Sequence, residues 1–299
     1  MILGAADVAF RESEMNCVLT VNPKTKIPSR LGVAREDTPA VLLVGGKGAR
    51  LQPILPSTPK PLAPLGNMPF LQLLVLQLRS QGIRQLVMCT GYLAEQIEEE
   101  FDDGHKWDVA IDYSKESCPL GTAGALKFAE RCLPQVSDFV VMNGDSFLEL
   151  DFRKFIHFHR EHGGLISIAV RKVENAIRYG TVQVDTNHRV IGFTEKTGTQ
   201  VPGIVNGGVY VFNRAVLQHI PDGPASLERD VFPRLLEHGV YALEQHGMFI
   251  DIGTPEDYVR AQELCDSLYR AALSNRNLGP AIAGPTSPGA HARALEKRN

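Results

Sequence analysis

A glycine-rich loop followed by basic residues is the first part of this sequence that could do chemistry. The stretch 45–48 holds three glycines and follows the apolar run 40–44 directly. Glycines let backbone N–H groups turn toward an anion, and Lys47, Arg50 and Lys60 add positive charge nearby. The loop therefore has the chemistry of a triphosphate cradle, although it matches neither the P-loop nor the dinucleotide-binding pattern, and on glycines alone a plain strand-to-loop turn is an equal interpretation.

Prolines set the position of Lys60. The loop carries prolines at 53, 56, 59, 61 and 64, and two of them flank this lysine. Because proline restricts its own backbone and that of the residue before it, Pro59 and Pro61 could hold the ammonium toward one phosphate.

Two aspartates follow apolar runs and are candidates for a metal site. Asp145 comes after the run 139–142, at the expected carboxyl end of a strand, where open α/β sheets bind ligands. Asp251 ends a second apolar run. Mg²⁺ usually takes one or two carboxylates together with water and phosphate. For each aspartate alone a turn or helix N-cap is the commoner role, and spacing does not show whether the two meet.

Three histidines form a weaker pattern. His157, His159 and His162 lack the i, i+4 spacing that presents two metal ligands on one helix face. We expect a polar helix surface there.

The elements that must position these residues alternate between short apolar runs and amphipathic stretches. Such alternation predicts β-α units, a parallel sheet and an α/β fold. After Asp145 the links shorten, and 185–188 signals a hairpin, so the sheet is expected to be mixed but mostly parallel. The expected strands are 40–44, 86–89, 109–113, 139–142, 165–171, 181–184 and 190–194. One expected helix begins at Pro69, and the others span 93–101, 122–132, 226–237 and 254–268.

Composition divides the chain and limits its partners. We expect an extension of unknown role at 1–38, one catalytic domain at 39–272 and a disordered Gly/Pro/Ser-rich tail at 273–299. A net charge of −3 offers no global field for nucleic acid. No apolar run is long enough for a membrane span, and five scattered cysteines suggest reduced thiols, so we expect a cytoplasmic protein without nucleic-acid or membrane partners.

The loop as a whole resembles the signature of the nucleoside-diphosphate-sugar pyrophosphorylases, the sugar-1-phosphate nucleotidyltransferases. Its segment LLVGGKGARLQPILPSTPKPL is similar to their G-G-x-G-T-R-L-x-P-L-T pattern followed by P-K-P, although Ala49 stands where threonine is usual. The resemblance implies a Rossmann-like, GT-A-like three-layer α/β/α fold and Mg²⁺ as cofactor. It also implies that Arg50 contacts the triphosphate, that Lys60 contacts the reacting phosphate, and that the nucleotide is bound by Leu43, Gly45, Gly46 and Gly48.

Four later segments resemble further motifs of the family in its order. CPLGTAG at 118–124 implies nucleobase contacts at Gly121 and Thr122, and Asp145 and Asp251 match the two metal aspartates. The segment FTEK at 193–196 is similar to the motif that contacts the sugar phosphate. The sugar-phosphate residues implied by these motifs are Gly180, Glu195, Lys196, Asn206 and Gly207.

The expected reaction joins a nucleoside triphosphate to a sugar 1-phosphate and releases pyrophosphate. The segments PLGTAG, 206–208 and 226–233 look most like bacterial D-glycero-D-manno-heptose 1-phosphate guanylyltransferases, which implies GTP, GDP-heptose and a place in surface-glycan synthesis such as lipopolysaccharide or capsule. Mannose-1-phosphate guanylyltransferases are the next candidate; they often carry a hexapeptide-repeat β-helix, for which nothing after Leu268 has the pattern. Enzymes that use UTP or dTTP, and a non-catalytic regulatory paralogue, stay open, as does homo-oligomerisation. A glycosyltransferase is disfavoured because Asp145 is not part of a D-x-D motif.

Overall fold

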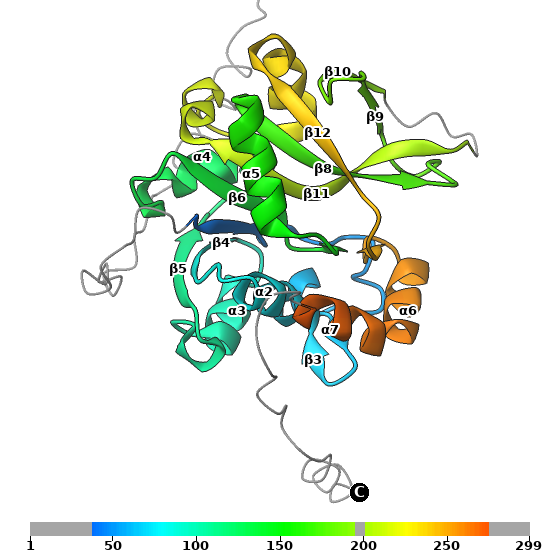
Figure 1. Cartoon of the computed structure of the whole chain (residues 1–299). Helices are drawn as coiled ribbons and strands as arrows, with labels where there is room; N and C mark the ends of the chain where they lie inside the picture. The colour runs from blue at the N-terminus through cyan, green and yellow to red at the C-terminus, as the bar shows by residue number, and fades with distance from the viewer. Residues whose placement is uncertain (1–37, 195–200, 275–299) are drawn as a thin grey trace, which may run out of the picture.

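One large sheet organises the chain. The computed structural model describes residues 38–194 and 201–274, and within them nine strands form this sheet (Figure 1). Its strands are β1 (Ala40–Leu43), β4 (Gln85–Thr90), β5 (Ala110–Lys115), β6 (Asp138–Asn143), β8 (Ile166–Val173), β9 (Thr181–Val184), β10 (Val190–Thr194), β11 (Gly203–Asn213) and β12 (Val240–Gln245). The predicted extension and tail lie outside the described residues, apart from Thr38, Leu273 and Ser274.

The sheet is parallel in its first half and mixed in its second. β1 lies between β4 and β6, with β5 outside β4, and these four strands are parallel. β11 runs antiparallel to β6 and β8, β12 is parallel to β8, and β9 with β10 forms the predicted hairpin beside β11. The expected mixed, mostly parallel sheet is confirmed.

Helices cover both faces and make three layers. Along β1, Ala40 and Leu42 face one core and Val41 the other, because successive side chains of a strand point to opposite faces. The first core packs under α2 (Phe70–Ser80), α3 (Ala94–Phe101), α5 (Phe152–His162), α6 (Pro255–Glu263) and α7 (Cys265–Leu273). The second packs under α4 (Gly121–Phe128), η3 (Ala129–Cys132), η4 (Arg214–His219), η5 (Leu227–Val231) and η6 (Phe232–His238).

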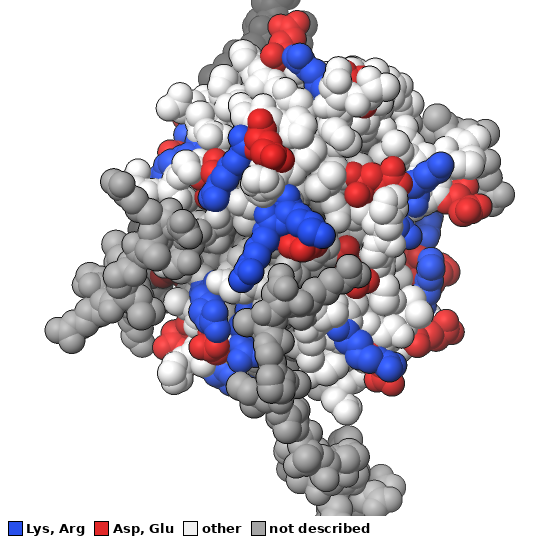
Figure 2. All heavy atoms as spheres, in the orientation of Figure 1, with Lys and Arg blue, Asp and Glu red and all other residues white. Residues whose placement is uncertain are grey.

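Several short elements lie outside the large sheet. β7 (Ser146–Leu148) pairs with β13 (Phe249–Asp251), and β2 (Pro64–Leu65) pairs with β3 (Met68–Pro69), both antiparallel. Two single turns of 3₁₀ helix complete the described elements, η1 (Lys60–Leu62) and η2 (His105–Trp107). On the face drawn in Figure 2, described basic and acidic side chains are interspersed. No helix within 38–194 or 201–274 is long and apolar enough to cross a bilayer.

Three local expectations are confirmed only in part. The helix predicted over 226–237 is a π turn followed by a 3₁₀ helix in which Pro233, which has no N–H to donate, occupies the first turn. The helix predicted over 254–268 breaks at Leu264 into α6 and α7. The expected polar surface holds for His157, which is exposed, but not for His159, which is 2% exposed and whose Nδ1 lies 2.9 Å from the Ser167 hydroxyl.

Candidate active site

The carboxyl ends of the parallel strands bring the predicted phosphate loop and the predicted metal aspartate to one edge of the sheet. Leu43 ends β1 and lies in register with Asn143 at the end of β6. The Gly144 amide, one residue before Asp145, donates to the Leu43 carbonyl at 2.9 Å. The loop that starts at Gly45 therefore begins beside Asp145.

Gly48 makes room for Lys60. The Gly48 backbone has φ +59°, and a Cβ there would lie 2.7 Å from the Lys60 Cβ. Its carbonyl accepts the Leu51 amide at 2.8 Å, which closes a turn. The loop thus folds back so that its glycine backbone packs against the lysine stem.

The two flanking prolines hold Lys60 at the start of η1. Pro59 is extended with φ −63° and ψ 140°, and Pro61 occupies the first turn of the 3₁₀ helix. The lysine is only 9% exposed. A buried stem between two restricted residues leaves the ammonium few positions to sample.

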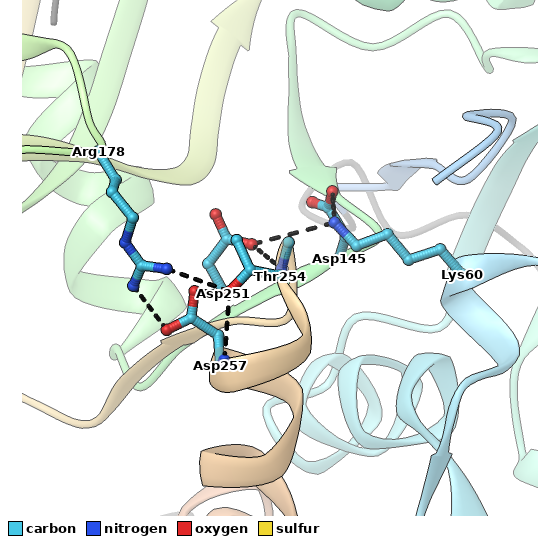
Figure 3. A network of polar contacts seen from close by, with 7 residues as sticks. Lys60, Asp145, Arg178, Asp251, Thr254 and Asp257 are labelled. Carbon is cyan, nitrogen blue, oxygen red and sulfur yellow. Dashed lines mark hydrogen bonds and ion pairs between the residues drawn. The ribbon is translucent and has the colours of Figure 1, made fainter. Parts of the chain in front are cut away.

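Lys60 meets both predicted metal aspartates. Its Nζ lies 2.6 Å from Asp145 Oδ2 and 4.0 Å from Asp251 Oδ1 (Figure 3). The antiparallel pair β7–β13 brings the aspartates together, since Asp251 is in register with Ser146 and the Ile252 amide donates to the Asp145 carbonyl at 3.0 Å. Three residues far apart in the sequence therefore share one cluster.

The environment of Asp251 disfavours its negative charge in the absence of a further cation. Burial raises the pKa of the Asp251 carboxyl, and the nearby Asp145 carboxylate raises it further. The Lys60 ammonium and the Gly253 amide, which donates to Oδ1 at 2.6 Å, act in the opposite direction. Two crowded carboxylates with hard oxygen donors suit a divalent cation such as Mg²⁺. Within the described residues no group of three or more His, Cys, Asp or Glu side chains is arranged to hold a metal, so water and substrate oxygens would complete the coordination.

Arg50 lies apart from this cluster. It is exposed on the loop, and none of the described hydrogen bonds or ion pairs joins it to Lys60 or to either aspartate. Gly46 is open as well, because a Cβ there would meet nothing within 4 Å. This part of the loop faces space in which a polyphosphate could lie.

Tight packing explains the glycines of the PLGTAG segment. Gly121 has φ +69°, and a Cβ there would lie 2.5 Å from the Ala225 carbonyl oxygen. The Thr122 hydroxyl accepts the Leu227 amide at 2.8 Å and donates to Glu228 at 3.3 Å. Both hydrogen bonds of the Thr122 hydroxyl are therefore made to other parts of the protein. A nucleotide would contact the backbone of this segment instead.

A carboxylate that the sequence motifs did not single out lies between this segment and the loop. A Cβ on Gly45 would lie 3.2 Å from Glu116 Oε1, and one on Gly91 would lie 2.8 Å from the same oxygen. The Leu120 amide donates to Oε2 at 3.2 Å. Burial raises the pKa of Glu116 from 4.5 to about 7, partly offset by that hydrogen bond. The only sequence signal was an acidic residue directly after the strand that precedes PLGTAG.

The predicted sugar segment forms a bulge in β11. The register with β8 shifts between Asn206 and Val209, and Gly208 has φ +75°. The Asn206 amide nitrogen donates to the Tyr210 hydroxyl at 2.8 Å, and its oxygen accepts the Gly208 amide at 2.9 Å. A Cβ on Gly207 would lie 2.5 Å from the Leu148 side chain, in the strand that follows Asp145.

The remaining predicted sugar residues are only partly described. Gly180 lies just before β9, and a Cβ there would lie 3.2 Å from the Thr194 carbonyl oxygen. Glu195 and Lys196 lie outside the described residues.

Comparison with known proteins gives a consistent result. Residues 39–267 match the model of the family described as nucleotidyl transferase. A mannose-1-phosphate guanylyltransferase catalytic subunit beta from Drosophila pseudoobscura pseudoobscura is 38% identical over 83% of this chain and 67% of its own length. A mannose-1-phosphate guanylyltransferase from Mycobacterium tuberculosis is 37% identical over 76% of this chain and 64% of its own.

A solved structure has the same fold over nearly its whole length. HddC from Yersinia pseudotuberculosis, complexed with GMP-PN, aligns with a TM-score of 0.69 and 33% identity and covers 76% of this chain and 98% of its own.

Proposed function

Because this chain belongs to the nucleotidyl transferase family and is a sugar-1-phosphate nucleotidyltransferase, we propose that it transfers GMP from GTP to a manno-configured sugar 1-phosphate and releases pyrophosphate. The convergence of Lys60, Asp145 and Asp251 is the observation that supports a catalytic site. A non-catalytic paralogue would have no need to hold one ammonium against two crowded carboxylates.

The chemistry depends on positioning and charge. An oxygen of the sugar 1-phosphate attacks the α-phosphorus of GTP, and the bond to the pyrophosphate leaving group breaks. The second pKa of a phosphate monoester is about 6, so the nucleophile is ionised at neutral pH and needs no protein base. In this proposal Lys60 stabilises the charge that develops on the transferred phosphate, and Arg50 stabilises the departing pyrophosphate.

Asp145 and Asp251 would hold Mg²⁺. When bound, the ion would neutralise phosphate charge and bring nucleotide and sugar phosphate together. Lys60 forms an ion pair with Asp145 in this structure. With substrates bound, the cation would replace Lys60 as the partner of Asp145, and the α-phosphate would replace Asp145 as the partner of Lys60. Glu195 and Lys196 keep the roles that the motif resemblance implies, as ligands of the sugar phosphate.

Glu116 supports GTP as the nucleotide. Guanine presents two donors side by side, N1–H and the exocyclic N2–H₂, which suit the two oxygens of one carboxylate. Uracil and thymine present a single N–H between two carbonyl oxygens, which a carboxylate would repel. The position of Glu116 between Gly45 and Leu120 places such an acceptor beside the loop expected to bind the nucleotide.

Two sugars fit the proposal, and they share the manno configuration of the ring. D-glycero-D-manno-heptose 1-phosphate is favoured by the motif resemblance at 206–208 and 226–233. Mannose 1-phosphate is favoured by similarity, because the relatives from Drosophila pseudoobscura pseudoobscura and Mycobacterium tuberculosis are mannose-1-phosphate guanylyltransferases. A GDP-heptose product would supply surface-glycan synthesis.

The test is pyrophosphate release in the presence of Mg²⁺. GTP, UTP, dTTP, CTP and ATP are each paired with heptose, mannose and glucose 1-phosphates. We expect release with GTP and a manno-configured sugar. Release only with UTP or dTTP would refute the guanine assignment, and no release from any pair would refute the catalytic proposal.

A further inference from the structure

Arg178 joins two segments whose relative position matters for the proposed reaction. It lies two residues before Gly180, in the loop that leads into β9, and its guanidinium reaches the first turn of α6 (Figure 3). Its Nη1 donates to the Thr254 hydroxyl at 3.1 Å and its Nη2 donates to Asp257 Oδ1 at 2.7 Å. One side chain thus connects the loop of the proposed sugar site to the turn that follows Asp251.

The receiving turn is itself tightly connected. Asp257 is 8% exposed, and its second oxygen accepts the Thr254 hydroxyl at 2.9 Å. Thr254 caps α6 by accepting the Asp257 amide. The preceding Gly253 amide holds the Asp251 carboxylate at 2.6 Å. One Arg178 partner, Thr254, thus lies three residues after the proposed metal ligand Asp251, and both partners belong to the capped first turn of α6.

A second contact fastens the same loop. The ring of Tyr179 packs against that of Phe249 in β13, with centroids 6.1 Å apart. Burial raises the pKa of the Tyr179 hydroxyl, and the Asp251 carboxylate raises it further, as expected of a ring held close to that aspartate. The Tyr179 amide donates to the Ala176 carbonyl at 2.9 Å, which closes a turn in the loop.

We infer that Arg178 is a positioning residue: by donating to Thr254 and Asp257 it holds the loop 174–180, which leads into Gly180, against the first turn of α6, which follows Asp251. The inference rests on the proposed function for the role of these two segments. A planar guanidinium suits the task because it donates to two acceptors at once, which a lysine ammonium does with less geometric control.

Direct contact of Arg178 with the sugar phosphate is the competing role. In that case the loss on removing Arg178 would not depend on Asp257. If Arg178 acts through α6, Arg178→Ala removes and Asp257→Asn weakens the same charge-assisted hydrogen bond, because the asparagine oxygen still accepts but carries no charge. Their effects are then not additive. A double-mutant cycle therefore separates the two roles.

The experiment measures steady-state kinetics and hydrogen exchange on the full chain. We expect Arg178→Ala to raise the KM for sugar 1-phosphate by about tenfold and Asp257→Asn to raise it by less, about threefold. The double variant should show the same KM as Arg178→Ala, and the KM for GTP should stay within about twofold in all three variants. Arg84→Ala is the matched control, since it breaks an exposed ion pair of similar length, 3.0 Å to Asp108, and should change neither KM.

Hydrogen exchange tests the contact between Arg178 and α6 without depending on enzymatic activity. Amides in 174–180 should exchange faster in both single variants than in the wild type or in Arg84→Ala. Unchanged exchange there would overturn the inference, even if the wild type proved inactive with every substrate pair. A rise in KM with Arg178→Ala but not with Asp257→Asn would also overturn it, in favour of direct substrate contact.

Discussion

Replacing Glu116 by glutamine should stabilise the protein and impair its use of GTP at the same time. The carboxyl is half-buried beside Gly45 and Gly91, and burial raises its pKa from 4.5 to about 7. Between these pH values the folded protein keeps a proton on Glu116 that the unfolded chain has released. The free energy of unfolding therefore falls as pH rises through this range, and the glutamine variant does not suffer that fall.

The size of the effect follows from the shift. One pKa unit corresponds to about 1.4 kcal/mol, so the shift sets a ceiling of roughly 3 kcal/mol at pH values above 7. Because part of the side chain is exposed, screening by water reduces this to about 1–2 kcal/mol. For GTP, loss of a two-point contact to guanine should lower kcat/KM about 10- to 100-fold, with a smaller change for UTP.

Two assays check these values. Urea unfolding should show the variant's advantage growing from near zero at about pH 5 to its full size at about pH 8. The control is Glu95→Gln: Glu95 is exposed, and its hydrogen bond with Lys115 lowers its pKa, so no advantage should appear. A stability difference that does not change with pH would refute the raised pKa of Glu116. An unchanged ratio of GTP to UTP activity would refute the role of Glu116 in base recognition.

Three further predictions concern Lys60, the proposed metal requirement and the packing of Gly121 against Ala225. Lys60→Ala should reduce kcat by at least about 100-fold in pyrophosphate release, and near wild-type turnover would contradict its assigned role. Removing divalent cations with a chelator should abolish turnover, which added Mg²⁺ restores; activity that survives chelation would disprove the metal requirement. Gly121→Ala should destabilise the fold by about 3 kcal/mol, since its φ is +69° and the new Cβ would press on Ala225. Gly46→Ala, which meets nothing within 4 Å, is the matched control for urea unfolding, and equal stabilities would refute the packing argument.

Local patterns predicted most of the parallel half of the fold. Apolar runs of strand length between amphipathic stretches identified β1, β4, β5 and β6, and Pro69 marked the start of α2. Patterns failed where tertiary packing overrides local preference. His159 reads as one polar residue on a helix, yet α5 turns it toward Ser167 on β8 and buries it.

Glu116 shows which feature of the candidate site could not be predicted from the sequence. A single glutamate after a strand carries no signal of its own in the sequence. Burial raises its pKa because the backbone at Gly45 and Gly91, from two segments distant in the sequence, packs against the Glu116 carboxylate, while the Leu120 amide acts in the opposite direction.

The sequence by itself determined the chemistry available to this protein: a glycine loop, a lysine between two prolines, and two aspartates after apolar runs, in the order of a known family. Only the tertiary structure decided that Asp145 and Asp251 meet at Lys60. Residue types and short-range order are properties of the chain, whereas the pairing of β7 with β13 is a long-range contact that no local pattern specifies. That pairing brings two aspartates, each ordinary in its own local sequence, into one candidate cation site.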